Sequence, residues 1–227
     1  MASRSQLPPG SRPLAIPQLS ALLVVLPVFI QAPWVRTSPM TAALFTVLLV
    51  TLGIVLERRP QSRWRDLGAL LVGFSGSWFA GCLFWGWCRL HPLWHLPIEA
   101  FALPLALAGL GGRWRLAGAF YLSSLLGTAA TDLAMAISGV MPLWPQVLGA
   151  PLQDAPRLLH EAGLAVLQPL PLTVVSLCAA GLVALCTSLR HRGPLGSLAA
   201  VTLATTLAVD GLFLAAALAA PGLSGLI

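Results

Sequence analysis

Seven apolar runs, each long enough to cross a bilayer as a helix, constrain this chain more than any other feature. A membrane-spanning helix needs about 20 predominantly apolar residues. The runs lie at residues 14–34, 38–56, 66–88, 93–112, 115–138, 163–189 and 195–220. Only 9% of the residues are charged, whereas a soluble domain carries about 25%. The sequence therefore predicts one all-α integral membrane domain, residues 1–227, built as a polytopic bundle of six to seven spans, with seven as the expected count.

The arginines predict the orientation of this bundle, because cytoplasmic loops of membrane proteins are enriched in basic residues. All 13 basic residues are arginine; with a cytoplasmic N-terminus, ten lie inside and Arg36, Arg89 and Arg157 lie outside. Residues 1–13 then form a short basic cytoplasmic tail. The run at 14–34 also has the make-up of a signal peptide, but its internal prolines favour an uncleaved first helix. Because the arginines are spread thinly between apolar runs, the partner we expect is the lipid bilayer and not nucleic acid.

One segment on the expected outer side, residues 138–163, is too polar to span the membrane. It reads SGVMPLWPQVLGAPLQDAPRLLHEAG. Asp154 before a first turn that contains Pro156 predicts a short helix in this segment. We expect the segment to lie in the membrane interface or to re-enter the membrane beside the bundle.

Motifs of membrane enzymes are few. The stretch GFSG, Gly73–Gly76, is similar to the serine motif of rhomboid intramembrane proteases, whose serine needs a histidine inside the membrane as its base. All four histidines fall in or beside predicted loops, so a small-residue stripe for helix packing, Gly73, Ser77 and Gly81, explains the stretch better. No H-E-x-x-H zinc motif and no aspartate-rich diphosphate motif occurs. The sequence assigns no catalytic residue and no cofactor, leaves a metal ligand open, and disfavours an enzyme.

Three carboxylates lie inside predicted spans, where a charge is costly unless it faces the bundle interior. They are Glu99, Asp132 and Asp210, at depths of ~10, ~9 and ~15 Å below the outer ends of their spans. Each ends a polar stripe with a four-residue step, which keeps side chains on one helical face. The stripes are His91–His95–Glu99, Ser124–Thr128–Asp132 and Thr202–Thr206–Asp210.

This pattern predicts a shared, outward-facing acidic pocket that binds substrate, with His95 at its mouth. Pro97 and Pro104 support the prediction, because they free the carbonyls of Leu93 and Ala100 and so break the fourth span. Broken helices in membrane proteins line cavities. The alternative is that each carboxylate only bonds a neighbouring helix.

Two stretches of the sequence carry a resemblance to a known family. PLWHLPIEAFALP, Pro92–Pro104, and TDLAMAISGVMPLWPQV, Thr131–Val147, resemble a family of multi-pass membrane proteins from cyanobacteria known only as domain of unknown function 3120. The resemblance, which the overall length supports, covers the chain from Pro13 to Ala220. It implies a photosynthetic bacterial source and a plasma or thylakoid membrane, and it carries no activity and no site residues.

Three classes of function follow from these observations. The first is transport or binding of a small solute or cation through the acidic pocket. The second is a structural or assembly factor of a photosynthetic membrane complex, in which small-residue stripes bind helices of a partner. The third, which the motifs support least, is an intramembrane enzyme.

Overall fold

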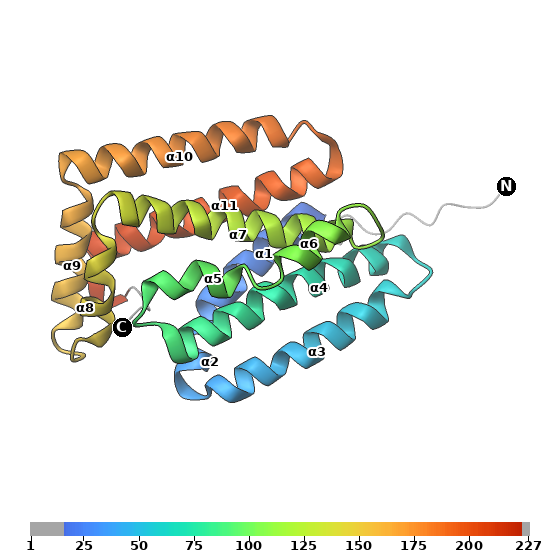
Figure 1. Ribbon diagram of the computed structural model, residues 1–227, viewed down its shortest axis with the longest axis horizontal. Helices are drawn as coiled ribbons and strands as arrows, with labels where there is room; N and C mark the ends of the chain where they lie inside the picture. The colour runs from blue at the N-terminus through green and yellow to red at the C-terminus, as the bar shows by residue number, and fades with distance from the viewer. Residues whose placement is uncertain (1–15, 224–227) are drawn as a thin grey trace, which may run out of the picture.

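The computed structural model describes residues 16–223, whose regular structure is helical, with no strand in that range (Figure 1). Six segments of this range are long and apolar enough to cross a membrane. They are the continuous run of α1 (Ile16–Leu26), η1 (Pro27–Gln31) and α2 (Ala32–Thr37), then α3 (Pro39–Glu57), α4 (Ser62–Leu83) with η2 (Phe84–Cys88), α7 (Arg115–Ile137), α10 (Pro169–Leu189) and α11 (Gly193–Ala219). The predicted all-α, multi-span bundle is confirmed. The expected cytoplasmic tail, residues 1–13, lies outside the described residues.

The fourth predicted span, residues 93–112, is not one long helix. It consists of η3 (Pro92–Trp94), α5 (His95–Glu99) and α6 (Leu103–Gly109), with a turn between α5 and α6. Pro104 stands in the first turn of α6, where it has no N–H to donate to the carbonyl of Ala100. The predicted break is therefore present, and the expected seven long helices become six long helices and one broken crossing of the bundle.

Helix α4 lies at the centre of the bundle, between α3 and α7 (Figure 1). The indole of Trp78 is 2% exposed and donates a hydrogen bond to the carbonyl of Ala42 on α3, over 2.9 Å. Helix α4 packs closely on its neighbours because it carries small residues. A Cβ at Gly73 would lie 2.5 Å from the backbone carbonyl oxygen of Ala117 on α7, and a Cβ at Gly81 would lie 2.9 Å from the side-chain amide oxygen of Gln31. The small-residue stripe thus packs within the chain.

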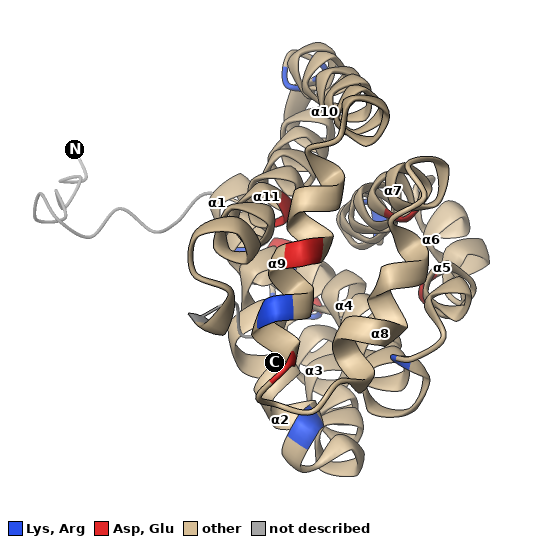
Figure 2. Cartoon of the chain, turned by 90° about the vertical axis from the view of Figure 1, so that its left-hand side faces the viewer, with Lys and Arg blue, Asp and Glu red and all other residues tan. Residues whose placement is uncertain are grey.

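The segment predicted to lie on the outer side, residues 138–163, folds into short helices across one end of the bundle (Figures 1 and 2). They are η4 (Met141–Leu143), α8 (Trp144–Gly149) and α9 (Ala155–Val166), while η5 (Pro221–Leu223) follows α11. Asp154 holds the N-cap position of α9 but makes no side-chain capping bond. The location of α8 and α9 in the membrane interface stays a prediction.

The loops divide the arginines between the two ends of the bundle. Figure 1 shows the α3–α4, α6–α7 and α10–α11 loops at one end, and the α2–α3 turn, α8 and α9 at the other. In the described range, the three arginines of the α8–α9 end are Arg36, Arg89 and Arg157. The eight at the opposite end are Arg58, Arg59, Arg63, Arg65, Arg113, Arg115, Arg190 and Arg192. This is the division predicted from the sequence, and which end faces the cytoplasm stays a prediction.

Candidate functional site

His95 lies between two carboxylates. It is the first residue of α5, and its Nδ1 lies 3.1 Å from Oδ1 of Asp132 on α7. Its Nε2 lies 3.5 Å from Oε1 of Glu99, one helical turn later on α5. The other oxygen of Glu99, Oε2, accepts a hydrogen bond of 2.9 Å from Oγ1 of Thr128 on α7. We call these four residues the His95 cluster.

Two helices position the His95 cluster, and each contributes a pair of residues with a four-residue step. Such a step places both side chains on one helical face, so α5 and α7 meet along their polar stripes. The ring of Phe84 from η2 stacks on the imidazole of His95, with 4.2 Å between ring centroids and 29° between planes. The side chains of His95, Glu99 and Asp132 are 17%, 15% and 15% exposed. The cluster is therefore mostly withdrawn from the surface.

The geometry of the His95 cluster calls for one more proton than a neutral imidazole and two ionised carboxylates would carry. A neutral imidazole donates through one nitrogen and accepts at the other, whereas an ionised carboxylate only accepts. Both ring nitrogens of His95 face carboxylate oxygens. A neutral ring would point a lone pair at one of them. The arrangement therefore fits either an imidazolium between two carboxylates or an imidazole beside one protonated acid.

The hydroxyl of Tyr121 on α7 bridges the break that follows Glu99. The backbone N–H of Ala102 donates to this hydroxyl over 3.1 Å, and the hydroxyl donates to the backbone carbonyl of Glu99. One side chain thus satisfies a donor and an acceptor that an unbroken helix would pair within itself. Non-helical backbone is tolerated in a membrane only where the protein satisfies it in this way.

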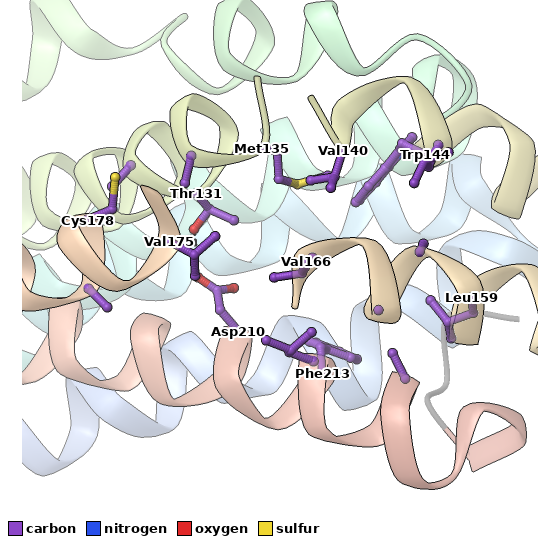
Figure 3. A pocket seen from close by; sticks show the side chains of 18 of the residues that line it. Thr131, Met135, Val140, Trp144, Leu159, Val166, Val175, Cys178, Asp210 and Phe213 are labelled. Carbon is purple, nitrogen blue, oxygen red and sulfur yellow. Dashed lines mark hydrogen bonds between the residues drawn. The ribbon is translucent and has the colours of Figure 1, made fainter. Parts of the chain in front are cut away.

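Asp210 on α11 lies on a different side of α7. Its Oδ2 accepts a hydrogen bond of 2.6 Å from Oγ1 of Thr131, the residue next to Asp132. No other side chain of residues 16–223 donates a hydrogen bond to Asp210 or forms an ion pair with it. Asp210 and Thr131 line a cavity of about 260 Å³ between α7, α10 and α11, which α8 and α9 cover at one end (Figure 3). We call this the Asp210 cavity.

The structure brings together three of the four residues predicted to share one pocket. His95, Glu99 and Asp132 meet in one cluster, whereas Asp210 shares no bonding partner with them. His91, which begins the first predicted stripe, is exposed in the loop before η3 and lies outside the cluster. Substrate binding by these residues stays a prediction. The reason for the separation is that a stripe defines a face of one helix but not the neighbour which that face meets.

Two residues of the site were missed in the sequence. Thr131 lies outside the predicted stripe, yet its hydroxyl binds Asp210, whereas the stripe hydroxyl of Thr206 donates to the backbone carbonyl of Thr202 on its own helix. Tyr121 is the only tyrosine of the chain and sits in a predicted span. A lone phenol in an apolar helix was the signal that could have found it, since a buried Tyr hydroxyl needs a partner.

Ser75 of the GFSG stretch does not have the surroundings of a catalytic serine. It is buried on α4, and its Oγ donates to the carbonyl of Val72 over 2.7 Å. No histidine of the described range forms a hydrogen bond with it. Within residues 16–223, no group of three His, Cys, Asp or Glu side chains is placed to hold a metal ion. Ser75 therefore agrees with the packing interpretation of this stretch.

Comparison with known proteins places the chain in one family. A family model described as "Protein of unknown function (DUF3120)" matches residues 20–218. This range includes both stretches that carried the resemblance, so the predicted family is confirmed, while a cyanobacterial source stays a prediction. No curated protein and no solved structure matches the chain. The function must therefore be argued from the residues of this chain.

Proposed function

We propose a function from the geometry, because the chain belongs to the DUF3120 family, whose description assigns no activity. The protein binds a small solute or cation within its bundle and carries it across the membrane, with protons exchanged at the His95 cluster. Ionisable side chains inside membrane bundles are costly and mark solute or proton pathways. In this chain, the ionisable side chains of both acidic sites bond to α7.

The observation that carries the proposal is that a single turn of α7 contributes to two acidic sites. Thr128 and Asp132 bind Glu99 and His95 of the broken crossing, while Thr131 binds Asp210 of α11. A change of protonation in the His95 cluster alters the free energy of interaction between α5 and α7. Because Thr131 lies in the same turn, such a change also shifts the partner of Asp210. Two sites that bias one structural element are thermodynamically coupled.

The broken crossing supports the same function. In membrane transporters, discontinuous helices carry binding sites and their ends move as separate units. Helices α5 and α6 are five and seven residues long and are joined by a turn that the Tyr121 hydroxyl bridges. The bonds that hold α5 to α7 run through ionisable groups, His95–Asp132 and Glu99–Thr128, so a change of protonation alters them. A short helix held in this way can change its position at a smaller cost than a long continuous one, so α5 suits a moving part.

Proton flux and cation uptake in proteoliposomes test this function. The purified protein is reconstituted with the pH-sensitive dye pyranine inside, a potassium gradient with valinomycin sets the potential, and radiolabelled methylammonium serves as a small cation. We expect protein-dependent proton flux or uptake that falls to the rate of protein-free liposomes in Asp132→Asn. Asp154→Asn, which changes a carboxylate of the outer segment, should behave as wild type. Equal rates in wild type and Asp132→Asn would contradict the proposal.

The proposed orientation places α8 and α9 on the outer side, in the plasma or thylakoid membrane of a photosynthetic bacterium. The support is the arginine division, because basic residues concentrate in cytoplasmic loops. A reporter fused after Arg192 should be cytoplasmic, and one fused after Gly149 should not. A cytoplasmic signal from the fusion after Gly149 would overturn the orientation.

A second candidate is a structural or assembly factor of a photosynthetic membrane complex. One observation favours it: α3, α4, α6 and α7 leave a groove of about 1050 Å³ that the described residues do not fill. A pull-down of the tagged protein in mild detergent separates the candidates. Recovery of photosystem subunits in stoichiometric amounts would favour the assembly role, and their absence would favour transport.

A further inference from the structure

We propose that the Asp210 cavity binds an amphipathic organic amine, with the ammonium group at Asp210 and an apolar body between α7, α10 and α11. The inference deepens the proposed function by naming the class of solute, and its transport aspect rests on that function. Binding itself is a separate property that can be measured without flux.

The first argument is the contrast inside the cavity. Among the described residues that line it, Asp210 supplies the one carboxylate and Thr131 the one hydroxyl, and the other lining side chains are almost all aliphatic or aromatic. Figure 3 shows Asp210 directed toward Thr131, with Val166, Val175 and Phe213 around it. Ligand sites of proteins have this composition, mostly apolar walls and a few placed polar groups that fix the orientation.

The second argument is the missing counter-ion. Glu99 and Asp132 share His95 at 3.5 and 3.1 Å, but no described side chain forms an ion pair with Asp210. Two basic groups of α9 are engaged elsewhere: Arg157 pairs with Glu161 over 2.6 Å, and His160 lies 3.2 Å from the carbonyl of Ala217. A carboxylate in apolar surroundings is costly without a partner. A bound cation supplies that partner.

Asp210 and Thr131 also have unused capacity to accept hydrogen bonds. The Thr131 hydroxyl has one proton and lies 2.6 Å from Oδ2 of Asp210 and 3.2 Å from the carbonyl of Gly127, so the shorter bond to Asp210 is the one we assign. This leaves Oδ1 of Asp210 and the lone pairs of the Thr131 hydroxyl to accept further hydrogen bonds. An ammonium group is a donor without an acceptor, so it matches this set of acceptors. A bare metal ion matches it poorly, since Asp210 and Thr131 are the only oxygen-bearing side chains among the described lining residues.

The size of the cavity limits the apolar body. An apolar cavity of about 150 Å³ accommodates benzene, so the same ratio gives about ten non-hydrogen atoms for a cavity of about 260 Å³. Helix α10 is the least buried of the six long spans, because only 6% of its most apolar 18-residue stretch is buried. We therefore expect a lipid-soluble amine to enter the cavity beside α10.

Calorimetric titration of the full-length protein in lipid nanodiscs tests the inference, with empty nanodiscs as the blank. The probes are 2-phenylethylamine and 2-phenylethanol, which have the same shape and differ in the ammonium group. A hydrogen bond to a charged group is worth about 1.5–3 kcal/mol, or about ten- to a hundredfold in affinity. We expect the amine to bind about ten- to a hundredfold more tightly than the alcohol.

Two variants make the assignment specific. Asp210→Asn should remove the preference for the amine and leave binding of the alcohol unchanged, whereas the matched Asp154→Asn should keep the preference. Ala179→Phe, which fills the cavity from the exposed helix α10 without touching a polar group, should weaken both probes and covers the case in which Asp210→Asn does not fold. No binding of either probe, equal affinity for both, or an unchanged preference in Asp210→Asn would overturn the inference.

The outcome is distinguishable from failure of the proposed function. If proton flux depends on Asp132 but the amine does not bind, transport stands and the amine assignment falls. If the amine binds through Asp210 but neither proton flux nor uptake depends on Asp132, the cavity is a ligand site and the transport proposal falls.

Discussion

Aspartate and threonine side chains have different roles on the two sides of helix α7. On one side, Asp132 and Thr128 join a cluster in which His95 supplies a shared partner for two carboxylates. On the other side, Thr131 meets Asp210, which has no cationic partner in the described part of the chain and faces a cavity. The difference teaches that a carboxylate inside a membrane bundle acquires its role from its counter-ion. The carboxylates of the first side have a partner within the chain, whereas for the second side we propose a bound ammonium group as the partner.

The surroundings of the two sides reinforce this difference. Phe84 stacks on His95, and the turn after Glu99 is bridged by Tyr121, so the cluster lies among packed groups. The Asp210 cavity instead borders α10, in which 6% of the most apolar 18-residue stretch is buried. The corresponding share is 61% for the central span, which consists of α4 and η2. Close packing withdraws a proton site from water, and a loosely attached helix suits a site that admits a ligand.

The largest effect is expected when the shared partner of the cluster is removed. His95→Ala leaves Asp132 and Glu99 without a counter-ion, and breaking a buried ion pair in this way costs about 3–5 kcal/mol. Unfolding of the purified protein in mixed micelles measures the loss. His91→Ala, at an exposed position of the preceding loop, is the control and should change stability by less than about 0.5 kcal/mol. Similar losses in both variants would remove the distinction between the cluster and its surroundings.

The comparison predicts opposite signs for two aspartates. Asp132→Asn should lower the free energy of unfolding by about 1.5–3 kcal/mol, because it removes a charged partner of His95. Asp210→Asn should leave stability unchanged or raise it by up to about 1 kcal/mol. The amide oxygen still accepts the bond from Thr131, and a charge without a partner is lost. Parallel unfolding curves without ligand provide the measurement, and an equal loss in both variants would refute the contrast.

An intermediate effect is expected at the break of the fourth crossing. Tyr121→Phe leaves the N–H of Ala102 and the carbonyl of Glu99 without their bridge, at a cost of about 1–3 kcal/mol. Amide hydrogen exchange should increase at Ala102 more than elsewhere on α5 and α6. Ser123→Ala is the control, since the hydroxyl of Ser123 bonds the carbonyl of Ala119 on its own helix. Unchanged exchange at Ala102 would show that the hydroxyl does not hold the break.

The smallest effects separate the two threonines of the same turn. Thr128→Val and Thr131→Val each remove one hydroxyl bond to a carboxylate, so each should cost about 1 kcal/mol in stability. Thr131→Val should weaken binding of 2-phenylethylamine more than Thr128→Val does, and Thr128→Val should alter proton flux more than Thr131→Val does. Thr205→Val, whose hydroxyl bonds the carbonyl of Val201, serves as the control. The reverse order of effects would contradict the assignment of the two threonines to the two sites.

Much of the fold follows from local patterns that are readable in the sequence. Apolar runs of bilayer length predicted the helices, and the missing N–H of Pro104 predicted the break before α6. The stripes on α5 and α7 predicted that His95, Glu99 and Asp132 share faces that meet. The stripe on α11 did not identify the hydroxyl partner of Asp210, which is Thr131, because the stripe hydroxyl of Thr206 bonds its own helix backbone.

By itself, the sequence determined the class of this protein, the positions of its helices and the division of its arginines. These properties depend on the length of apolar runs, on proline chemistry and on charge between runs, which are all local. Only the tertiary structure decided which carboxylate received a counter-ion. Adjacent residues of a helix point about 100° apart, and the rotation of each helix is set by close contacts such as that of Gly73 with Ala117. This packing turns Asp132 toward His95 and Thr131 toward Asp210, because side chains far apart in the chain fix the angle at which α7 meets its neighbours.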